Sequence, residues 1–350
     1  MGAVAPEVAL GELYVGYAAD PDIRSVASSG GVVSGVLTHL LERHLIDAAL
    51  VSRITSVDGR VCGVTELART KQQVLDHAGS SYIDTPVVNR VKALRDIPGK
   101  VAVVALPCQA RLLKRLLARD GALRQKVALV IGLFCRGTVT RQFYEDIFGR
   151  YGIDQAAVES VKVDRGHLKG MVYVRLRDQQ ERAIPFATLN AYRMAGVHAK
   201  RYCLWCDEHL SEQADLSVGD IFTKEFKRRP IKHSAFICRS ETAADVVAQM
   251  QCDGLLELEL FGIDRYRRTF SRLERYSNDL RPRRVAARLT GFKPVGPPSW
   301  RVNPAHCLAW TLFMLNRRLT GSDAGRRLVY GLPSSLISLV SLSIKALSRI

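Results

Sequence analysis

Apolar runs alternate with helical patterns in the first half of the chain. Nearly continuous runs at 101–107 and 126–134 are typical of strands that are buried on both faces, and segments with helical spacing follow them at 110–118 and 140–149. This alternation predicts right-handed βαβ crossovers and a parallel sheet. Other apolar stretches predict strands at 14–18, 46–54 and 61–67 and a helix over 32–41.

From residue 158 the pattern changes to alternation of apolar and polar positions. The segments 160–164, 171–176 and 184–186 predict an antiparallel meander. We also expect strands at 215–222, 235–238 and 255–260 and a helix over 243–250. The predicted fold class is therefore α/β with α+β character: parallel βαβ units, an antiparallel meander and a C-terminal helical tail.

Beyond residue 265 the chain is basic and interrupted by prolines, which indicates a linker before the tail. The tail segments 305–315 and 332–350 have helical spacing, and the last interleaves leucine and isoleucine with serine. Such a segment suits either a membrane surface or the body of the protein itself. We expect three parts: 1–150 with βαβ units, 151–264, and a basic, partly helical extension over 265–350.

The net charge of the chain indicates which classes of ligand and partner it attracts. The chain has 51 Lys and Arg against 34 Asp and Glu, a formal charge of +17, and many basic clusters come late. Such a field attracts anions, whether a phosphate-rich cofactor, an acidic protein or anionic lipid. No aromatic RNA-binding signature or zinc-finger spacing accompanies the arginines, so nucleic acid is not an expected partner.

The strongest candidate for chemistry is a C-x-x-C turn at Cys203 and Cys206, which directs two sulfurs at one point. Cys108 and Cys135 each follow an apolar run, and strand carboxyl ends are where open α/β sheets place ligands. Both thiols are therefore expected to face one crevice. Four thiolates bind either an iron–sulfur cluster or structural zinc, although zinc usually takes two C-x-x-C knuckles. The other cysteines are interpreted as packed thiols: Cys62, Cys238, Cys252 and Cys307.

Two turns rich in serine and glycine are candidates for binding a ligand. The first comprises Ser28, Ser29, Gly30 and Gly31, and the second Gly79, Ser80, Ser81 and Tyr82. Small residues before a helix leave backbone amides free for phosphate, although a simple serine cap explains the first turn as well. Lys162, Arg165 and His167 lie in or beside a predicted loop and are candidates for contacting substrate or supplying a proton, although they are interpreted first as surface residues.

Taken together, these segments resemble the beta subunit family of coenzyme F420 hydrogenase/dehydrogenase. The resemblance covers about residues 14–260. It rests on Arg24 with the turn at 28–31, the turn at 78–82, the segments around Cys108 and Cys135, and the run from Cys203 to Asp220.

The resemblance implies an iron–sulfur flavoprotein that binds FAD beside a [4Fe-4S] cluster. It implies that Cys108, Cys135, Cys203 and Cys206 are the cluster ligands. It also makes Arg24, both serine–glycine turns and Asp220 the candidate FAD contacts.

The expected activity is electron transfer between a one-electron carrier, such as a ferredoxin-like protein, and a two-electron acceptor, with coenzyme F420 as a candidate substrate. The alternative is a non-catalytic family member in a polysaccharide-biosynthesis or redox complex. Eight cysteines in 350 residues are too sparse for a disulfide scaffold, so we expect a reducing cytoplasm, with the tail as a candidate anchor to an anionic membrane surface.

Overall fold

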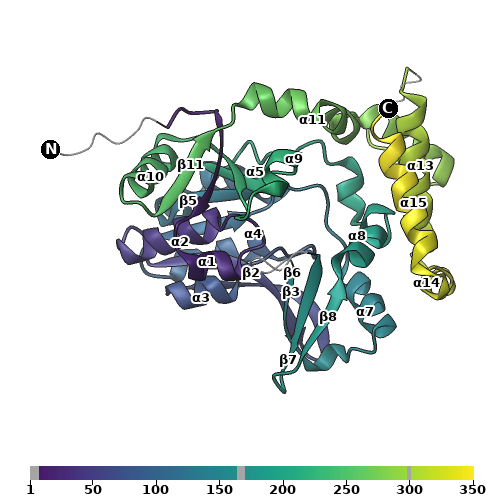
Figure 1. Ribbon diagram of the computed structural model, residues 1–350, viewed down its shortest axis with the longest axis horizontal. Helices are drawn as coiled ribbons and strands as arrows, with labels where there is room; N and C mark the ends of the chain where they lie inside the picture. The colour runs from purple at the N-terminus through teal and green to yellow at the C-terminus, as the bar shows by residue number, and fades with distance from the viewer. Residues whose placement is uncertain (1–7, 164–169, 298–300) are drawn as a thin grey trace.

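The computed structural model describes residues 8–163, 170–297 and 301–350 and is built around one eight-stranded sheet (Figure 1). The strand order is β11-β1-β10-β9-β5-β4-β2-β3. The strands are β1 Leu13–Ala18, β2 Ala48–Val57, β3 Arg60–Ala68, β4 Val101–Ala105, β5 Val127–Leu133, β9 Leu216–Asp220, β10 Ser234–Cys238 and β11 Leu256–Leu260.

The centre of this sheet is parallel. β2 pairs with β4, β4 with β5, and β5 with β9 in parallel register, whereas β3, β10, β1 and β11 add antiparallel pairings at both sides. This confirms the parallel βαβ units. The sheet contains strands from both of the first two expected parts of the chain, because β9 and β10 lie between β5 and β1, and β11 forms the edge next to β1.

Helices cover both faces of the sheet, so the central strands are apolar throughout. Leu129 and Ile131 of β5 pack with α2 (Val32–Glu42) and α10 (Glu241–Cys252), while Val130 between them packs on the other face. That second face is covered by α4 (Val87–Lys92), α5 (Pro107–Arg119) and α6 (Gly121–Lys126). Shorter helices complete this part: α1 (Pro21–Val26), α3 (Lys71–Asp76) and α9 (Lys224–Arg228).

The predicted meander is a separate three-stranded antiparallel sheet of β6 (Val158–Val163), β7 (Met171–Leu176) and β8 (Glu181–Pro185). Ile54 and Val61, from the far ends of β2 and β3, share its core. Two helices pack into the same core, α7 (Arg141–Arg150) and α8 (Phe186–Met194). The long β2–β3 hairpin thereby joins the large sheet to the meander.

The expected linker is wrong for residues 265–290, because two helices occupy that region, whereas the proline-containing residues 291–297 are not helical. α11 (Ile263–Asn278) runs from the large sheet towards the C-terminal helices, and α12 (Leu280–Thr290) follows it (Figure 1). Pro282 lies in the first turn of α12, where a proline removes no helical hydrogen bond. The remaining helices, α13 (Pro304–Leu319), α14 (Asp323–Gly331) and α15 (Ser334–Leu347), confirm the helical tail.

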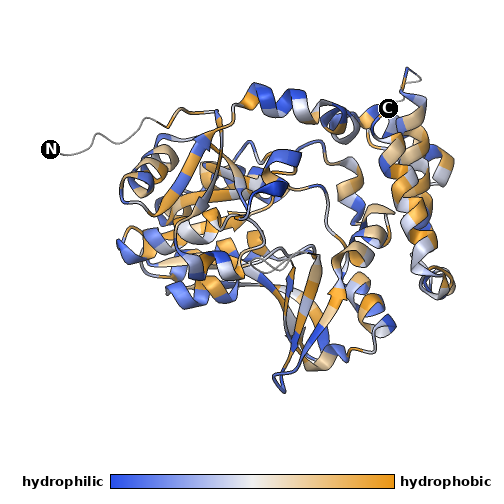
Figure 2. Cartoon of the chain, in the orientation of Figure 1, coloured by the Kyte–Doolittle hydropathy of each residue, from blue (hydrophilic) through white to orange (hydrophobic). Residues whose placement is uncertain are grey.

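In the described part of the chain no single helix is long and apolar enough to cross a membrane. α14 and α15 reach the required length and composition only together, and they are bent by 99° relative to each other. Figure 2 shows that apolar residues run along the visible surface of α15 as well as between the layers of the protein.

Candidate functional site

Cys108 lies in the first turn of α5, directly after β4. The helix begins at Pro107, and the amide of Leu106 donates to Gln109 Oε1 (2.9 Å), which fixes this turn. Cys108 is exposed, yet partial desolvation of its thiol and the charges of Cys206 and Cys203 raise its pKa to about 11, although backbone amides of the helix start oppose the rise. The helix N-terminus thus presents a thiol towards the C-x-x-C cysteines.

Cys135 follows β5 and is held by the backbone of a second segment. Its amide donates to the carbonyl of His209 (3.0 Å), and His209 Nδ1 lies 2.7 Å from the Cys135 carbonyl. The amide of Gly137 donates to Cys135 Sγ (3.4 Å). Burial raises the pKa of this thiol to about 12, and the charges of the other three predicted ligands add to the rise.

The C-x-x-C turn begins on a short 3-10 helix, Arg201–Trp205. The amide and hydroxyl of Thr138 lie 3.5 and 3.7 Å from Cys203 Sγ, and Cys206 Sγ donates to the Glu208 carbonyl at 3.4 Å. A methyl group on Gly137 would stand 3.8 Å from Cys203 Cβ, so the loop after β5 packs directly on this turn. Burial also raises the pKa of Cys203, and the Cys206 charge contributes. The structure therefore brings all four predicted thiols within electrostatic reach of one another.

The four thiols are candidate ligands of a metal centre. Among the described residues, no three His, Cys, Asp or Glu side chains come close enough together to hold one ion. A structural zinc site needs four ligands at roughly 2.0–2.3 Å from the metal. The donor set, four soft thiols with backbone amides directed at the sulfurs, suits an iron–sulfur cluster.

Ion pairs tie the C-x-x-C turn to the neighbouring elements. Arg111 of α5 contacts Asp207 (3.4 Å) and Glu208 (3.1 Å), so the helix that carries Cys108 is joined to the segment after Cys206. On the other side, Asp84 pairs with Lys200 (2.5 Å) and accepts a hydrogen bond from the Tyr202 hydroxyl (2.9 Å). Its position next to Cys206 predicts that Asp207 either caps the turn or orients the cluster loop or the flavin. In the structure, the ion pair of Asp207 with Arg111 joins two segments that carry cysteines.

Arg283 of α12 was missed by the sequence analysis. Its side chain is 2 % exposed, and Nη1 donates to the carbonyls of Leu204 (3.2 Å) and Cys206 (2.7 Å), while Nη2 donates to the Ser277 carbonyl. The guanidinium carbon lies 4.2 Å from the ring centroid of Trp310 in α13. Burial lowers the pKa of Arg283 to about 10. No local pattern marks this arginine, because its partners beside the cysteines lie about 80 residues earlier in the chain.

The two serine–glycine turns meet in space. Ser28 Oγ accepts a hydrogen bond from the Ser80 amide (2.8 Å) and donates to the Val163 carbonyl at the end of β6 (2.7 Å). Ser29 Oγ donates to the His233 carbonyl (2.8 Å), and the neighbouring Gly30 amide donates to Ser234 Oγ (3.0 Å). Asp220 lies beside them, since it pairs with Ser234 in the β9–β10 ladder.

Two lysines converge on these turns. Lys232 Nζ donates to the Ser28 carbonyl (3.2 Å), and Lys162 Nζ donates to the Leu75 carbonyl (3.0 Å). Lys162 also lies beside Gly79, since a methyl group on that glycine would stand 3.9 Å from the lysine. Lys162 is half-buried against the second turn, and whether it is a surface residue or a substrate contact stays a prediction. Arg165 and His167 lie outside the described residues.

Arg24 is directed towards its own backbone. Its Nη1 donates to the carbonyls of Ala18 (2.6 Å) and Ala19 (2.5 Å), and within the described residues its buried Nε has no hydrogen-bond partner. The Ala18 amide in turn donates to the Gly30 carbonyl (2.8 Å), so Arg24 supports the first turn from behind. Gly31 has φ = +80°, a left-handed conformation that a glycine adopts without strain.

The second turn leads from the serines to the cysteines. Ser81 is half-buried, and Tyr82 stacks on Phe186 with the Arg193 guanidinium 4.5 Å from its ring centroid. The Tyr82 carbonyl accepts a hydrogen bond from the Val139 amide (2.9 Å), four residues after Cys135. The serine turns and the thiols are thus two ends of one connected region.

The other four cysteines and the two histidines that flank the C-x-x-C turn differ in their surroundings. Cys238 is buried and Cys62 and Cys307 are half-buried, but Cys252 is exposed, so the prediction of a packed thiol is wrong there. His198 contacts Asp146 (2.7 Å) and stacks on Tyr330. Of the two histidines that flank the C-x-x-C turn, His209 is the one that contacts a predicted ligand.

Comparison with known proteins identifies the family. The model for the beta subunit N terminus of coenzyme F420 hydrogenase/dehydrogenase matches residues 13–92, and that for the C terminus matches residues 99–262. The coenzyme F420 hydrogenase subunit beta of Methanothermobacter thermautotrophicus is 26% identical over 70% of this chain and 83% of that subunit. The beta subunit of the F420-dependent formate dehydrogenase 1 of Methanococcus maripaludis is 26% identical over 60% of this chain and 52% of that protein.

Two further relatives bear on length and fold. The coenzyme F420-dependent sulfite reductase of Methanocaldococcus jannaschii is 27% identical over 77% of this chain, which spans 41% of that enzyme. A chain of the F420-reducing [NiFe] hydrogenase complex from Methanosarcina barkeri superposes with a TM-score of 0.58 at 19% identity, covering 79% of this chain and 93% of that chain, which shows a shared fold. Because the two family models cover more than half of the sequence, the chain belongs to the coenzyme F420 hydrogenase/dehydrogenase beta subunit family.

Proposed function

We propose that this protein is an oxidoreductase that holds a [4Fe-4S] cluster through Cys108, Cys135, Cys203 and Cys206. The observation that carries the proposal is the convergence of four thiols from three separate segments, where burial and the neighbouring thiols raise the pKa values of Cys108, Cys135 and Cys203. A raised pKa means that deprotonating these thiols without a metal costs free energy. Iron that replaces the protons neutralises the thiolate charge and compensates this cost. A bound cluster supplies single-electron transfer, and hydrogen bonds to its sulfurs tune the potential.

FAD is the proposed second cofactor, at the joined turns of Ser28 and Ser80. The turns offer hydroxyls and backbone amides, and Lys162 and Lys232 bring positive charge that suits phosphate groups. Tyr82 stacks on Phe186 and has the Arg193 guanidinium near its ring, and its carbonyl accepts from Val139 in the loop after Cys135. The protein's own contribution is to hold the two sites at a fixed separation and to control access.

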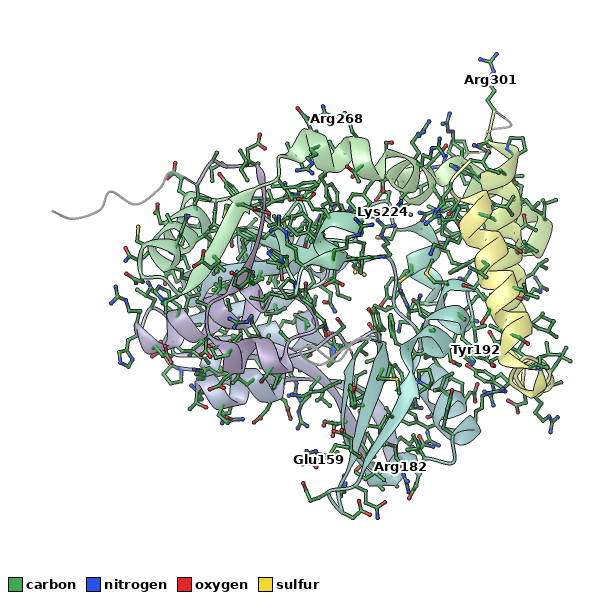
Figure 3. All side chains as sticks on the ribbon, in the orientation of Figure 1. Glu159, Arg182, Tyr192, Lys224, Arg268 and Arg301 are labelled. Atoms are coloured by element: carbon green, nitrogen blue, oxygen red, sulfur yellow. The ribbon has the colours of Figure 1, made fainter. Side chains whose placement is uncertain are left out.

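The proposed partners are a ferredoxin-like one-electron carrier and a two-electron acceptor, for which coenzyme F420 is the first candidate. Relatives named as F420 hydrogenase, F420-dependent formate dehydrogenase and F420-dependent sulfite reductase proteins support this choice. The formal charge of +17 favours an acidic carrier. Arg268 points outward from α11 in Figure 3. The same helix contains Ser277, whose carbonyl accepts a hydrogen bond from Arg283, and Arg283 also donates to the Cys206 carbonyl. All eight cysteines are free thiols, which supports a reducing cytoplasmic location.

The test is anaerobic purification followed by an absorbance spectrum and assays of iron, sulfide and flavin. Wild type is expected to contain all three, and the variant that combines Cys203→Ser with Cys206→Ser is expected to lose iron and sulfide. A matched control combines Cys252→Ser with Cys307→Ser, two thiols outside the site, and is expected to retain them. Zinc in place of iron, or neither metal nor flavin, would overturn the proposal and favour a non-catalytic role in a polysaccharide-biosynthesis or redox complex.

A further inference from the structure

The C-terminal helices concentrate both exposed apolar side chains and positive charge. Of the 19 exposed large hydrophobic side chains in the described residues, ten lie between 289 and 350. Residues 280–350 also contain twelve Lys and Arg but a single acidic residue, Asp323. This segment therefore contributes +11 of the formal charge of +17, and it lies beyond both family models.

α15 is apolar on two opposite sides. Ile337 and Ile344 are buried and attach the helix to the protein, whereas Leu336, Leu339 and Leu342 are 46 %, 58 % and 57 % exposed. With about 100° of rotation per residue, Leu339 and Leu342 lie on the side opposite the two isoleucines, and Leu336 lies about 90° from them, beside that side. A helix on the surface of a soluble domain ordinarily has polar residues on that side.

Cationic groups border the leucine row. Lys345 and Arg349 are exposed at the C-terminal end of α15, and Arg327 is exposed on α14 beside Leu328. No Asp or Glu occurs between residues 324 and 350. An exposed leucine row on a helix that contains serines and Lys345 but no acidic residue matches the requirements of a helix that lies in a membrane interface, where leucines enter the acyl boundary and cations contact anionic headgroups.

From this geometry we infer that the outer side of α15, with Leu328 and Arg327 of α14, is a docking surface for an anionic lipid membrane. A second copy of the chain is disfavoured as the occupant, because two segments of charge +11 repel each other. The helix lies on the membrane and does not cross it, since Ile337 and Ile344 stay packed on the protein. The inference concerns residues outside the thiol region and is independent of the proposed redox function.

The test is vesicle flotation of the full-length protein. Wild type is expected to float with vesicles of equal parts phosphatidylcholine and phosphatidylglycerol, to remain free with phosphatidylcholine alone, and to be released by high salt. The variant with Leu339→Gln and Leu342→Gln is expected to bind at least about tenfold more weakly. Replacing Lys345 and Arg349 by Gln is expected to weaken binding about tenfold.

A matched control variant tests whether binding depends on the leucines of α15 or on any exposed leucine of the protein. Leu112→Gln with Leu260→Gln replaces leucines that are 50 % and 62 % exposed on other elements, and is expected to leave binding unchanged. Thermal unfolding followed by circular dichroism checks that each variant is folded. The inference is overturned if wild type does not bind the anionic vesicles. It is also overturned if the variant with Leu339→Gln and Leu342→Gln binds as strongly as the control with Leu112→Gln and Leu260→Gln. Light scattering that shows a dimer broken by the leucine changes, without vesicle binding, would assign the surface to an interface between copies of the chain instead.

Discussion

Arg283→Met tests whether the C-terminal helices hold the cysteine turn in place. The guanidinium makes three charge-assisted hydrogen bonds to carbonyls, each contributing about 1.5–3 kcal/mol. Its burial cost opposes them, since a pKa lowered from 12.5 to about 10 corresponds to about 3 kcal/mol. The difference predicts that Arg283→Met lowers the free energy of unfolding by about 3 kcal/mol.

The assay is urea unfolding of the full-length protein followed by circular dichroism. Arg283→Lys is expected to fall between wild type and the methionine variant, because a single ammonium keeps the charge but does not span three carbonyls. Arg281→Met is the control, since Arg281 is exposed and pairs with Asp279, so its loss is expected to cost under about 1 kcal/mol. A value for Arg283→Met within about 0.5 kcal/mol of wild type would refute the reasoning.

A second readout separates positioning of the turn from general stability. Iron release to a chelator is expected to be faster in Arg283→Met than in wild type under conditions where both are folded, because the carbonyls of Leu204 and Cys206 lose their common donor. Loss of a buried positive charge beside Cys206 is also expected to lower the reduction potential of the bound cluster. Unchanged iron release with reduced stability would leave Arg283 a purely structural residue.

Three other predictions concern the site and its support. Burial lowers the pKa of His209 from 6.5 to about 4, so the folded state favours neutral imidazole, and stability is complete above pH 6.5 and decreases by up to about 3 kcal/mol as the pH falls to 4. Urea unfolding at pH 7 and pH 5 measures the free energy of unfolding that is lost between the two. This loss is expected to be smaller in His209→Gln than in wild type and unchanged in the control His44→Gln, which replaces an exposed histidine. Equal losses in both variants would contradict the assignment. Gly196 has φ = +87°, and an added methyl would meet a carbonyl of α13 at 2.4 Å, so Gly196→Ala is expected to destabilise the C-terminal helices by more than about 1 kcal/mol, detectable as earlier proteolysis of that region. Ser28→Ala removes the hydroxyl that accepts from Ser80, and is expected to lower the flavin content of the purified protein while leaving iron unchanged; full flavin content would exclude this role.

Local pattern was sufficient for most of the elements. The continuous apolar runs at 101–107 and 126–134 correspond to β4 and β5, because a parallel strand that is covered on both faces needs apolar side chains at every position. Alternation identified β6, β7 and β8, which have one buried face. α11 and α12 were missed, because arginines and a proline in the first turn of α12 conceal helices whose stability depends on packing against distant residues.

The sequence by itself determined which residues carry the candidate chemistry: four cysteines, two of them at the ends of parallel strands, and two serine–glycine turns. Tertiary structure decided how they combine. Ser28 meets Ser80, Lys162 turns towards Gly79, and Arg283 reaches back to the carbonyls beside the C-x-x-C turn. These contacts join residues 52 to 83 positions apart along the chain, and periodicity carries no information at that range. Contacts of this kind exist only once the sheet and the C-terminal helices have packed together.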